Sequence, residues 1–202
     1  MPGDFIQAAE RCGLIVAIGQ AVLRMAIQQQ NIWRKSGRPD LMVSVNVSPV
    51  ELMSADYLKT IAVLLQDESY TPNSLMLEVT ETELLRADHG KVVLDGICER
   101  GLRLGIDDFG MGYSSVSYLR QFPLDVIKID RSFVVGATAS AQGLALLTAV
   151  TSMARSLGKQ LIAEGIETQE QLNLLRGLGC SHGQGFLYSP AVPAERFEQM
   201  LH

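Results

Sequence analysis

The 202-residue sequence has little of several features that mark particular classes of protein. Its three cysteines, Cys12, Cys98 and Cys180, are odd in number and form no Cys-x-x-Cys pair, which argues against a disulfide framework or a thiolate zinc site. No apolar run approaches the roughly 18 residues that a membrane span requires. The first residues show neither the basic nor the apolar region of a secretory signal. These absences predict a cytoplasmic location.

The sequence also lacks an excess of positive charge. Acidic residues outnumber basic ones 22 to 17, and the net charge is −5. This balance argues against non-specific binding to nucleic acid or to an anionic membrane surface, so we expect no nucleic-acid partner. An anionic substrate would need local positive charge, most simply from metal ions. With 47% hydrophobic residues, the chain has an ordinary globular composition and a length that fits one domain, residues 1–202.

What the sequence does contain is a regular alternation of strand-like and helix-like segments. Helical periodicity over about 5–35, with a break at Gly13, precedes the first strand. Later helices are expected from Ser48 to about 66, up to about 100, near 115–120, over 140–157, over 168–178 and from about 194. The expected strands are 41–47, 74–81, 102–108, 124–130, 160–164 and 183–188. Such alternation predicts an α/β fold with a parallel sheet, either a doubly wound open sheet or a TIM-type (β/α) barrel.

Polar residues at the carboxyl ends of these strands favour the barrel. A barrel gathers all such ends around one mouth, whereas an open sheet spreads them along a line. The sequence contains about six strand-like segments, two fewer than the eight strands of a (β/α)₈ barrel. The polar residues at the strand ends are Asn46, Glu78, Asp107, Asp108, Lys128, Glu164 and Gln184.

Two adjacent carboxylates, Asp107 and Asp108, end one strand just before a glycine-flanked turn. Keeping both ionised requires a cation or strong hydrogen bonds. Together with Asn46, Glu78 and Glu164 they form a set of hard oxygen ligands suited to Mg²⁺ or Mn²⁺. Carboxylates around two divalent ions are used for in-line displacement at phosphorus, which suggests phosphodiester hydrolysis.

A structural explanation exists for each of these residues taken alone. Asp-Asp before a glycine can be an ordinary turn, and Asn46 can be a turn former. Glu78 and Glu164 can be acids at helix N-termini, and Lys128 can be an ion-pair partner of Asp130 or Asp107. All of them meeting by coincidence at one end of a barrel is improbable.

The ordered series of motifs resembles the EAL domain, a family that hydrolyses bacterial cyclic di-GMP on a modified TIM barrel. The similarity extends from residue 2 to the C-terminal helix. The motifs are Pro2-Gly3-Asp4-Phe5-Ile6 with Ala9-Glu10, Val45-Asn46-Val47-Ser48, Leu77-Glu78-Val79-Thr80-Glu81, Asp107-Asp108-Phe109-Gly110-Met111-Gly112-Tyr113-Ser114-Ser115, Lys128-Ile129-Asp130-Arg131-Ser132-Phe133-Val134, Ala163-Glu164-Gly165-Ile166-Glu167-Thr168 and Gln184-Gly185.

The resemblance implies a two-metal site holding Mg²⁺ or Mn²⁺. Asn46, Glu78 and Asp107 would bind the first ion. Asp107 would bridge to the second, which Asp108 and Glu164 would help to hold.

Further roles follow from the same resemblance. Lys128 would position the attacking water, Glu164 would act as general base, and Asp108 would belong to the catalytic group. Gln184 and Asp130 would contact substrate. Glu81 and Glu167 would brace the mobile loop over 109–115, which couples dimerisation to activity in this family.

The family also implies partners and a setting: cyclic di-GMP, a homodimer through the barrel, and an upstream sensor or GGDEF domain in a protein that can be membrane-attached. One departure keeps an alternative open. The chain begins after the Glu-Ala-Leu strand, so the metal-binding glutamate of that strand, the nearby substrate-contacting arginine and the first two barrel strands are expected to be missing. The alternative is an inactive EAL-type module that binds cyclic di-GMP or a protein.

Overall fold

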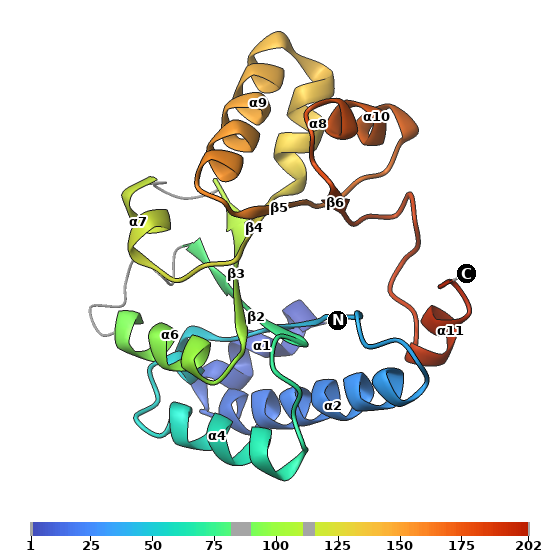
Figure 1. Ribbon diagram of the computed structural model, residues 1–202. Helices are drawn as coiled ribbons and strands as arrows, with labels where there is room; N and C mark the ends of the chain where they lie inside the picture. Colours follow the sequence, from blue (N-terminus) through green and yellow to red (C-terminus); the bar gives the residue numbers. More distant parts are fainter. Residues whose placement is uncertain (1, 82–89, 111–115, 202) are drawn as a thin grey trace. The chain divides into compact units, whose positions relative to one another are not determined.

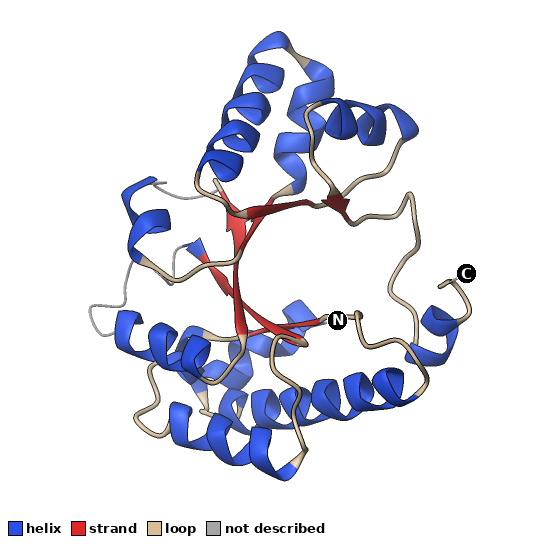
Figure 2. Ribbon diagram, in the orientation of Figure 1, coloured by secondary structure: helices blue, strands red, loops and turns tan. Residues whose placement is uncertain are grey.

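The computed structural model describes residues 2–81, 90–110 and 116–201, and in this part of the chain helices alternate with six strands (Figures 1 and 2). The strands are hydrogen-bonded in chain order, β1-β2-β3-β4-β5-β6. The pairs β1–β2, β4–β5 and β5–β6 are parallel. The predicted α/β class and the predicted six strands are therefore confirmed.

The chain divides into two compact units, and strand β3 (Arg103–Phe109) contributes to both. Unit 1 comprises Met1–Gly105 and Ser115–Leu124, and unit 2 comprises Ile106–Ser114 and Asp125–His202. Besides the first part of β3, unit 1 contains α1 (Pro2–Arg11), α2 (Ile15–Lys35), β1 (Val43–Asn46), α3 (Pro49–Leu52), α4 (Tyr57–Asp67), β2 (Leu75–Thr80), α6 (Gly90–Glu99) and α7 (Val116–Gln121).

Helices α2 and α4 lie side by side in unit 1 (Figure 1). In β2, the residues from Leu75 to Val79 are all buried, as expected for a strand covered on both faces. The predicted break at Gly13 is confirmed, since it lies between α1 and α2 with a φ of 76°.

Ser48 fixes the chain where it leaves β1. Its side chain accepts a hydrogen bond from the backbone N–H of Val50, and Glu51 accepts one from the backbone N–H of Ser48, which forms a capping box. The Ser48 hydroxyl also donates to Glu10 Oε1 at 2.8 Å. The residues that follow Asn46 are thereby tied both to α3 and to α1.

The described part of unit 2 contains four helices, and the first three of them lie on the same side of its strands (Figure 2). The sequence analysis missed the first of them and placed the first helix after the fourth strand only at about residue 140. The elements of unit 2 are the end of β3, β4 (Val126–Ile129), α8 (Arg131–Ala139), α9 (Ala141–Ser156), β5 (Gln160–Ala163), α10 (Gln169–Gly177), β6 (His182–Gly183) and α11 (Ala194–Glu198).

The last strand is much shorter than predicted. Only His182 and Gly183 pair with β5, and the expectation of a strand continuing to residue 188 is wrong. The reason is local: Tyr188 donates its backbone N–H to the carbonyl of Gly185, which closes a turn there.

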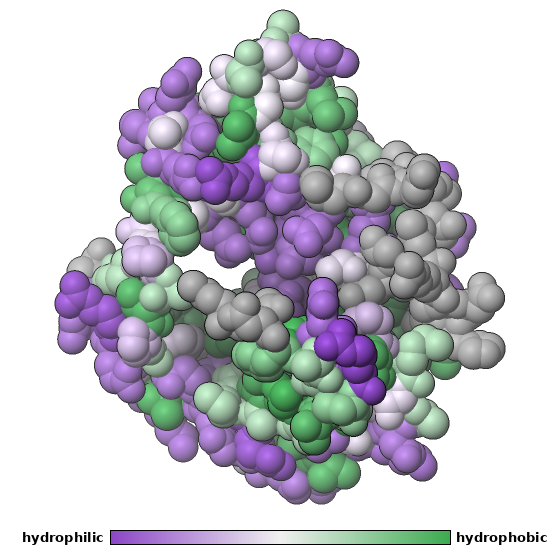
Figure 3. All heavy atoms as spheres, turned by 180° about the vertical axis from the view of Figure 1, so that it is seen from behind, coloured by the Kyte–Doolittle hydropathy of each residue, from purple (hydrophilic) through white to green (hydrophobic). Residues whose placement is uncertain are grey.

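The described surface mixes apolar and polar side chains. Met25, Val63 and Phe186 are among the exposed hydrophobic residues, and Figure 3 shows hydrophobic atoms interspersed with hydrophilic ones on the face it draws. Single exposed apolar residues are normal on folded domains. Among the described residues, no helix has both the length and the apolar character needed to cross a bilayer.

The contact between α8 and α9 depends on a glycine. A Cβ added at Gly143 would overlap the backbone carbonyl of Gly136, whereas a Cβ added at Gly136 would meet nothing within 4 Å. We expect Gly143→Ala to destabilise the protein by about 1–3 kcal/mol through overpacking. Gly136→Ala is the matched control and should stabilise by about 0.5–1 kcal/mol through helix propensity. Denaturant unfolding measures both, and equal effects would contradict the close contact.

Candidate active site

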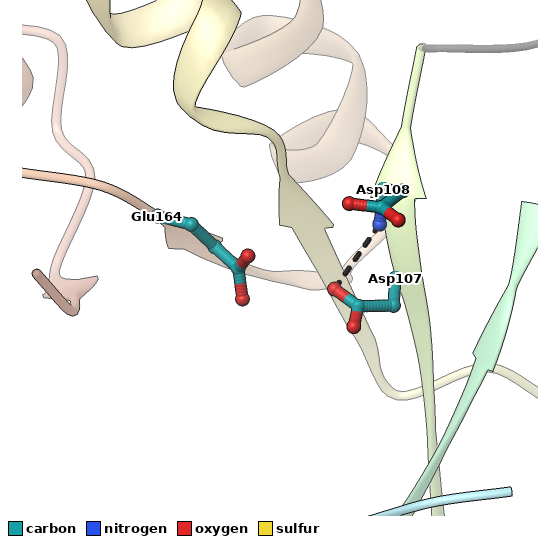
Figure 4. A group of neighbouring side chains, drawn as sticks. All are labelled: Asp107, Asp108 and Glu164. Atoms are coloured by element: carbon teal, nitrogen blue, oxygen red, sulfur yellow. Dashed lines mark hydrogen bonds between the residues drawn. The ribbon is translucent and has the colours of Figure 1, made fainter. Parts of the chain in front are cut away.

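Three carboxylates from two strand ends meet in unit 2. Asp107 and Asp108 lie near the end of β3, and Glu164 follows β5 directly. One oxygen from each carboxylate lies within 4.8 Å of the others, an arrangement that could hold a metal ion. Figure 4 shows Glu164 on its own segment, across from the two aspartates at the tip of β3. The carboxylates that the sequence singled out in this unit are therefore brought together.

Lys128 is the cation of this cluster. Its ammonium Nζ lies 3.1 Å from Asp107 Oδ1 and 2.6 Å from Glu164 Oε1. The side chain is buried, and its neighbours in β4, Ile127 and Ile129, are fully buried. The structural alternative of an ion pair with Asp107 is thus real, but Lys128 contacts two site carboxylates at once. It holds them close together and offsets part of their mutual repulsion.

Asp108 adopts an unusual backbone conformation. Its φ is 52°, in the left-handed region, and its backbone N–H donates to Asp107 Oδ1 at 3.1 Å (Figure 4). Partial burial raises the pKa of the Asp108 carboxyl above its usual value, and the charges of Asp107 and Asp130 raise it further. Lys128 acts in the opposite direction. A bound cation would favour the charged form of Asp108.

Gln184 fixes the orientation of Glu164. Its side-chain Nε2 donates to Glu164 Oε1 at 2.8 Å. Its backbone N–H donates to the Ala163 carbonyl at 2.8 Å, so the amide is anchored beside the end of β5. Gln184 therefore contacts a site carboxylate directly, and its contact with substrate stays a prediction.

Asp130 has a structural task that the sequence analysis did not assign. Its carboxylate accepts the backbone N–H of Ser132 at 2.8 Å and caps α8. Hydrogen bonds from Ser132 hold the pKa of Asp130 below its ordinary value. An aspartate two residues before a serine, with an apolar run after it, is an N-cap pattern that could have revealed α8.

Glu167 forms an ion pair with a residue that the sequence analysis did not single out. Arg131 Nη2 lies 2.9 Å from Glu167 Oε2. The stem of Arg131 passes over Gly165, where an added Cβ would overlap it. Glu167 therefore links the segment after β5 to the start of α8.

Asn46 and Glu78 belong to unit 1, where they are register partners across the β1–β2 pair. Val47 donates its backbone N–H to the Glu78 carbonyl at 2.9 Å, and Glu78 is buried. Glu81 is buried as well. Residues 111–115 of the predicted mobile loop lie outside the described residues.

Unit 1 also contains a small cavity, but it is not a nucleotide site. About 20 Å³ of space lies among residues of α2, β1, α3 and α4, including Leu23, Val45, Glu51 and Tyr57. This is room for about one water molecule.

Comparison with known proteins identifies the family. A family model described as the EAL domain matches residues 1–191. The chain belongs to the EAL domain family. The structure is similar to the Pseudomonas aeruginosa MucR phosphodiesterase in complex with c-di-GMP, with a TM-score of 0.93, 38% identity, and coverage of 98% of this chain and 80% of that one. The modified TIM-barrel fold of EAL domains is thereby confirmed for this chain.

Curated relatives include cyclic di-GMP phosphodiesterases. Signaling protein YkoW of Bacillus subtilis is 40% identical over 99% of this chain and 25% of its own length. The bifunctional diguanylate cyclase/cyclic di-GMP phosphodiesterase MucR of Pseudomonas aeruginosa is 38% identical over 96% of this chain and 29% of its own length. The chain thus spans between a quarter and a third of the length of these relatives.

The buried ammonium gives a test of the site's electrostatics. We expect Lys128→Met to destabilise the metal-free protein by about 2–3 kcal/mol, because it leaves carboxylates without their cation. Added Mn²⁺ should restore more stability to this variant than to the wild type. Lys91→Met removes an exposed ion pair with Asp95 and serves as the control, with an expected change below about 1 kcal/mol. Thermal melts with and without Mn²⁺ measure the stability of both variants. Equal losses of stability in Lys128→Met and Lys91→Met would refute the role of Lys128.

Proposed function

We propose that the chain is a metal-dependent phosphodiesterase that hydrolyses cyclic di-GMP to linear pGpG. One observation carries the proposal: in a member of the EAL domain family, Asp107, Asp108 and Glu164 converge around the buried ammonium of Lys128. Relatives named as cyclic di-GMP phosphodiesterases support the choice of substrate. A chain that needed these residues only for folding would gain nothing from three adjacent acids.

The donor set fits a hard divalent cation. Carboxylate oxygens are the ligands that Mg²⁺ and Mn²⁺ prefer, and within unit 2 they are already gathered. We assign Asp107, Asp108 and Glu164 to the metal site, and we retain Asn46 and Glu78 as metal ligands from the resemblance to the EAL domain. When bound, such ions supply an activated water and neutralise charge on the phosphoryl oxygens.

The protein's own residues orient the attacking water and accept its proton. Lys128, held against Asp107 and Glu164, orients the attacking water. Glu164 takes a proton from that water as general base, and Gln184 keeps its carboxylate in place. Water adds to one phosphorus while one ester P–O bond breaks, and the leaving oxygen takes up a proton from solvent, which opens the ring to pGpG. We retain Gln184 and Asp130 as substrate contacts.

The remaining assignments belong to the same proposal. We infer that residues 1–202 act as one EAL-type domain in bacterial second-messenger signalling, that the protein works in the cytoplasm, and that it forms a homodimer next to a sensor or GGDEF domain. Glu81 and Glu167 would brace the loop that follows β3.

Incubation of the chain with cyclic di-GMP and Mg²⁺ or Mn²⁺, followed by chromatographic separation of guanine nucleotides, tests this function. The expected product is pGpG, formed only with metal. Binding of cyclic di-GMP without turnover would replace the proposal by a catalytically inactive binding module. Failure both to bind and to hydrolyse it would remove cyclic di-GMP as the ligand.

Removal of one site carboxylate should separate catalysis from folding. We expect Asp108→Asn to lower turnover at least about 100-fold, since a charged ligand and its electrostatic stabilisation are lost. The melting temperature of the metal-free protein should stay the same or rise, because repulsion with Asp107 is relieved. Asp95→Asn, at an exposed acid on α6, is the matched control and should keep full turnover. Undiminished turnover in Asp108→Asn would contradict the assignment.

A further inference from the structure

The acid cluster exists because the backbone turns at Asp108. Neighbouring side chains on a regular strand point to opposite faces, so Asp107 and Asp108 would diverge if β3 continued unchanged. The φ of 52° at Asp108 breaks this alternation, and both carboxylates lie near that of Glu164. A non-glycine residue in the left-handed region costs about 1–2 kcal/mol, so surrounding contacts must hold it there.

The two residues that follow Asp108 make the contacts that hold it in this conformation. Phe109 is buried in the core immediately after Asp108. Gly110 follows with a φ of 95°, and a Cβ added there would overlap the ring of Phe133. The absence of a side chain at Gly110 therefore lets the Phe133 ring lie directly against the backbone two residues beyond Asp108.

The position of the Phe133 ring is set by the connection between β4, the strand that carries Lys128, and α8. Phe133 lies in the first turn of α8, and its backbone N–H donates to the Asp130 carbonyl at 3.1 Å. Asp130 caps that helix and stands two residues after Lys128, while Val134 anchors the helix in the core. The ring thus has a fixed position relative to the strand that carries the Lys128 ammonium.

We propose that Phe133 is a positioning residue that keeps Asp108 in its metal-binding conformation by packing on Gly110. The inference rests on the proposed metal-dependent function. Phe133 touches neither the carboxylates nor substrate in this role. It restrains the turn, and without the ring Asp108 relaxes out of the left-handed region and its carboxylate leaves the cluster. Loss of such a supporting contact typically costs metal affinity about 10-fold.

Titration calorimetry with Mn²⁺ on the full chain tests the proposal. Specific binding is defined as the part that Asp108→Asn removes. We expect Phe133→Ala to weaken it about 10-fold and Phe133→Leu, which keeps part of the apolar contact, to weaken it less. Phe197→Ala, at a half-buried phenylalanine of α11 in the same unit, is the matched control and should keep wild-type affinity.

Metal-free melting curves separate positioning from general stability. Both alanine variants should melt earlier than the wild type, but only Phe133→Ala should lose Mn²⁺ affinity. Unchanged affinity in Phe133→Ala, or an equal loss in Phe197→Ala, overturns the positioning role and leaves the metal site standing. If Phe133→Ala does not fold, wild-type affinity in Phe133→Leu overturns it instead. Absence of specific Mn²⁺ binding in the wild type overturns both this role and the metal step of the proposed function.

Discussion

The contact of Lys128 with Asp107 and Glu164 is the interaction on which the site depends. Two like charges 4 Å apart repel by about 4 kcal/mol at an effective dielectric of 20, which is comparable to a large share of a domain's stability. Three carboxylates this close together are therefore stable in their ionised form only with a cation among them. With all three carboxylates ionised, one buried ammonium leaves the group two negative charges in excess, which a bound cation would offset.

The sequence predicted the arrangement of the site better than its details. Strand periodicity and capping residues such as Ser48 and Thr168 act locally, so the six strands and most helix starts could be read from neighbouring residues. Parallel strands place their carboxyl ends at one edge, and this rule alone brought Asp107, Lys128 and Glu164 together. The short β6 escaped prediction because a turn hydrogen bond, rather than hydrophobicity, ends it.

Other features depend on contacts that no local pattern encodes. The ion pair of Arg131 with Glu167 joins residues 36 positions apart, and the packing of Phe133 on Gly110 joins two different elements. The left-handed backbone at Asp108 is likewise set by what surrounds it, because aspartate favours an extended or helical conformation when isolated. The missed helix α8 is different: its Asp130 cap was visible, but the residue was interpreted as a substrate contact or an ion-pair partner of Lys128.

The short length of β6 affects how easily this end of the sheet opens. Strands with few ladder hydrogen bonds can open locally at a free energy below that of unfolding the whole domain, and β6 pairs with β5 through two residues. Gln184 follows this strand and carries the amide that orients Glu164. If this end of the sheet opens, Glu164 loses the Gln184 amide but keeps the Lys128 ammonium at 2.6 Å, so the ion pair is the last restraint on the carboxylate.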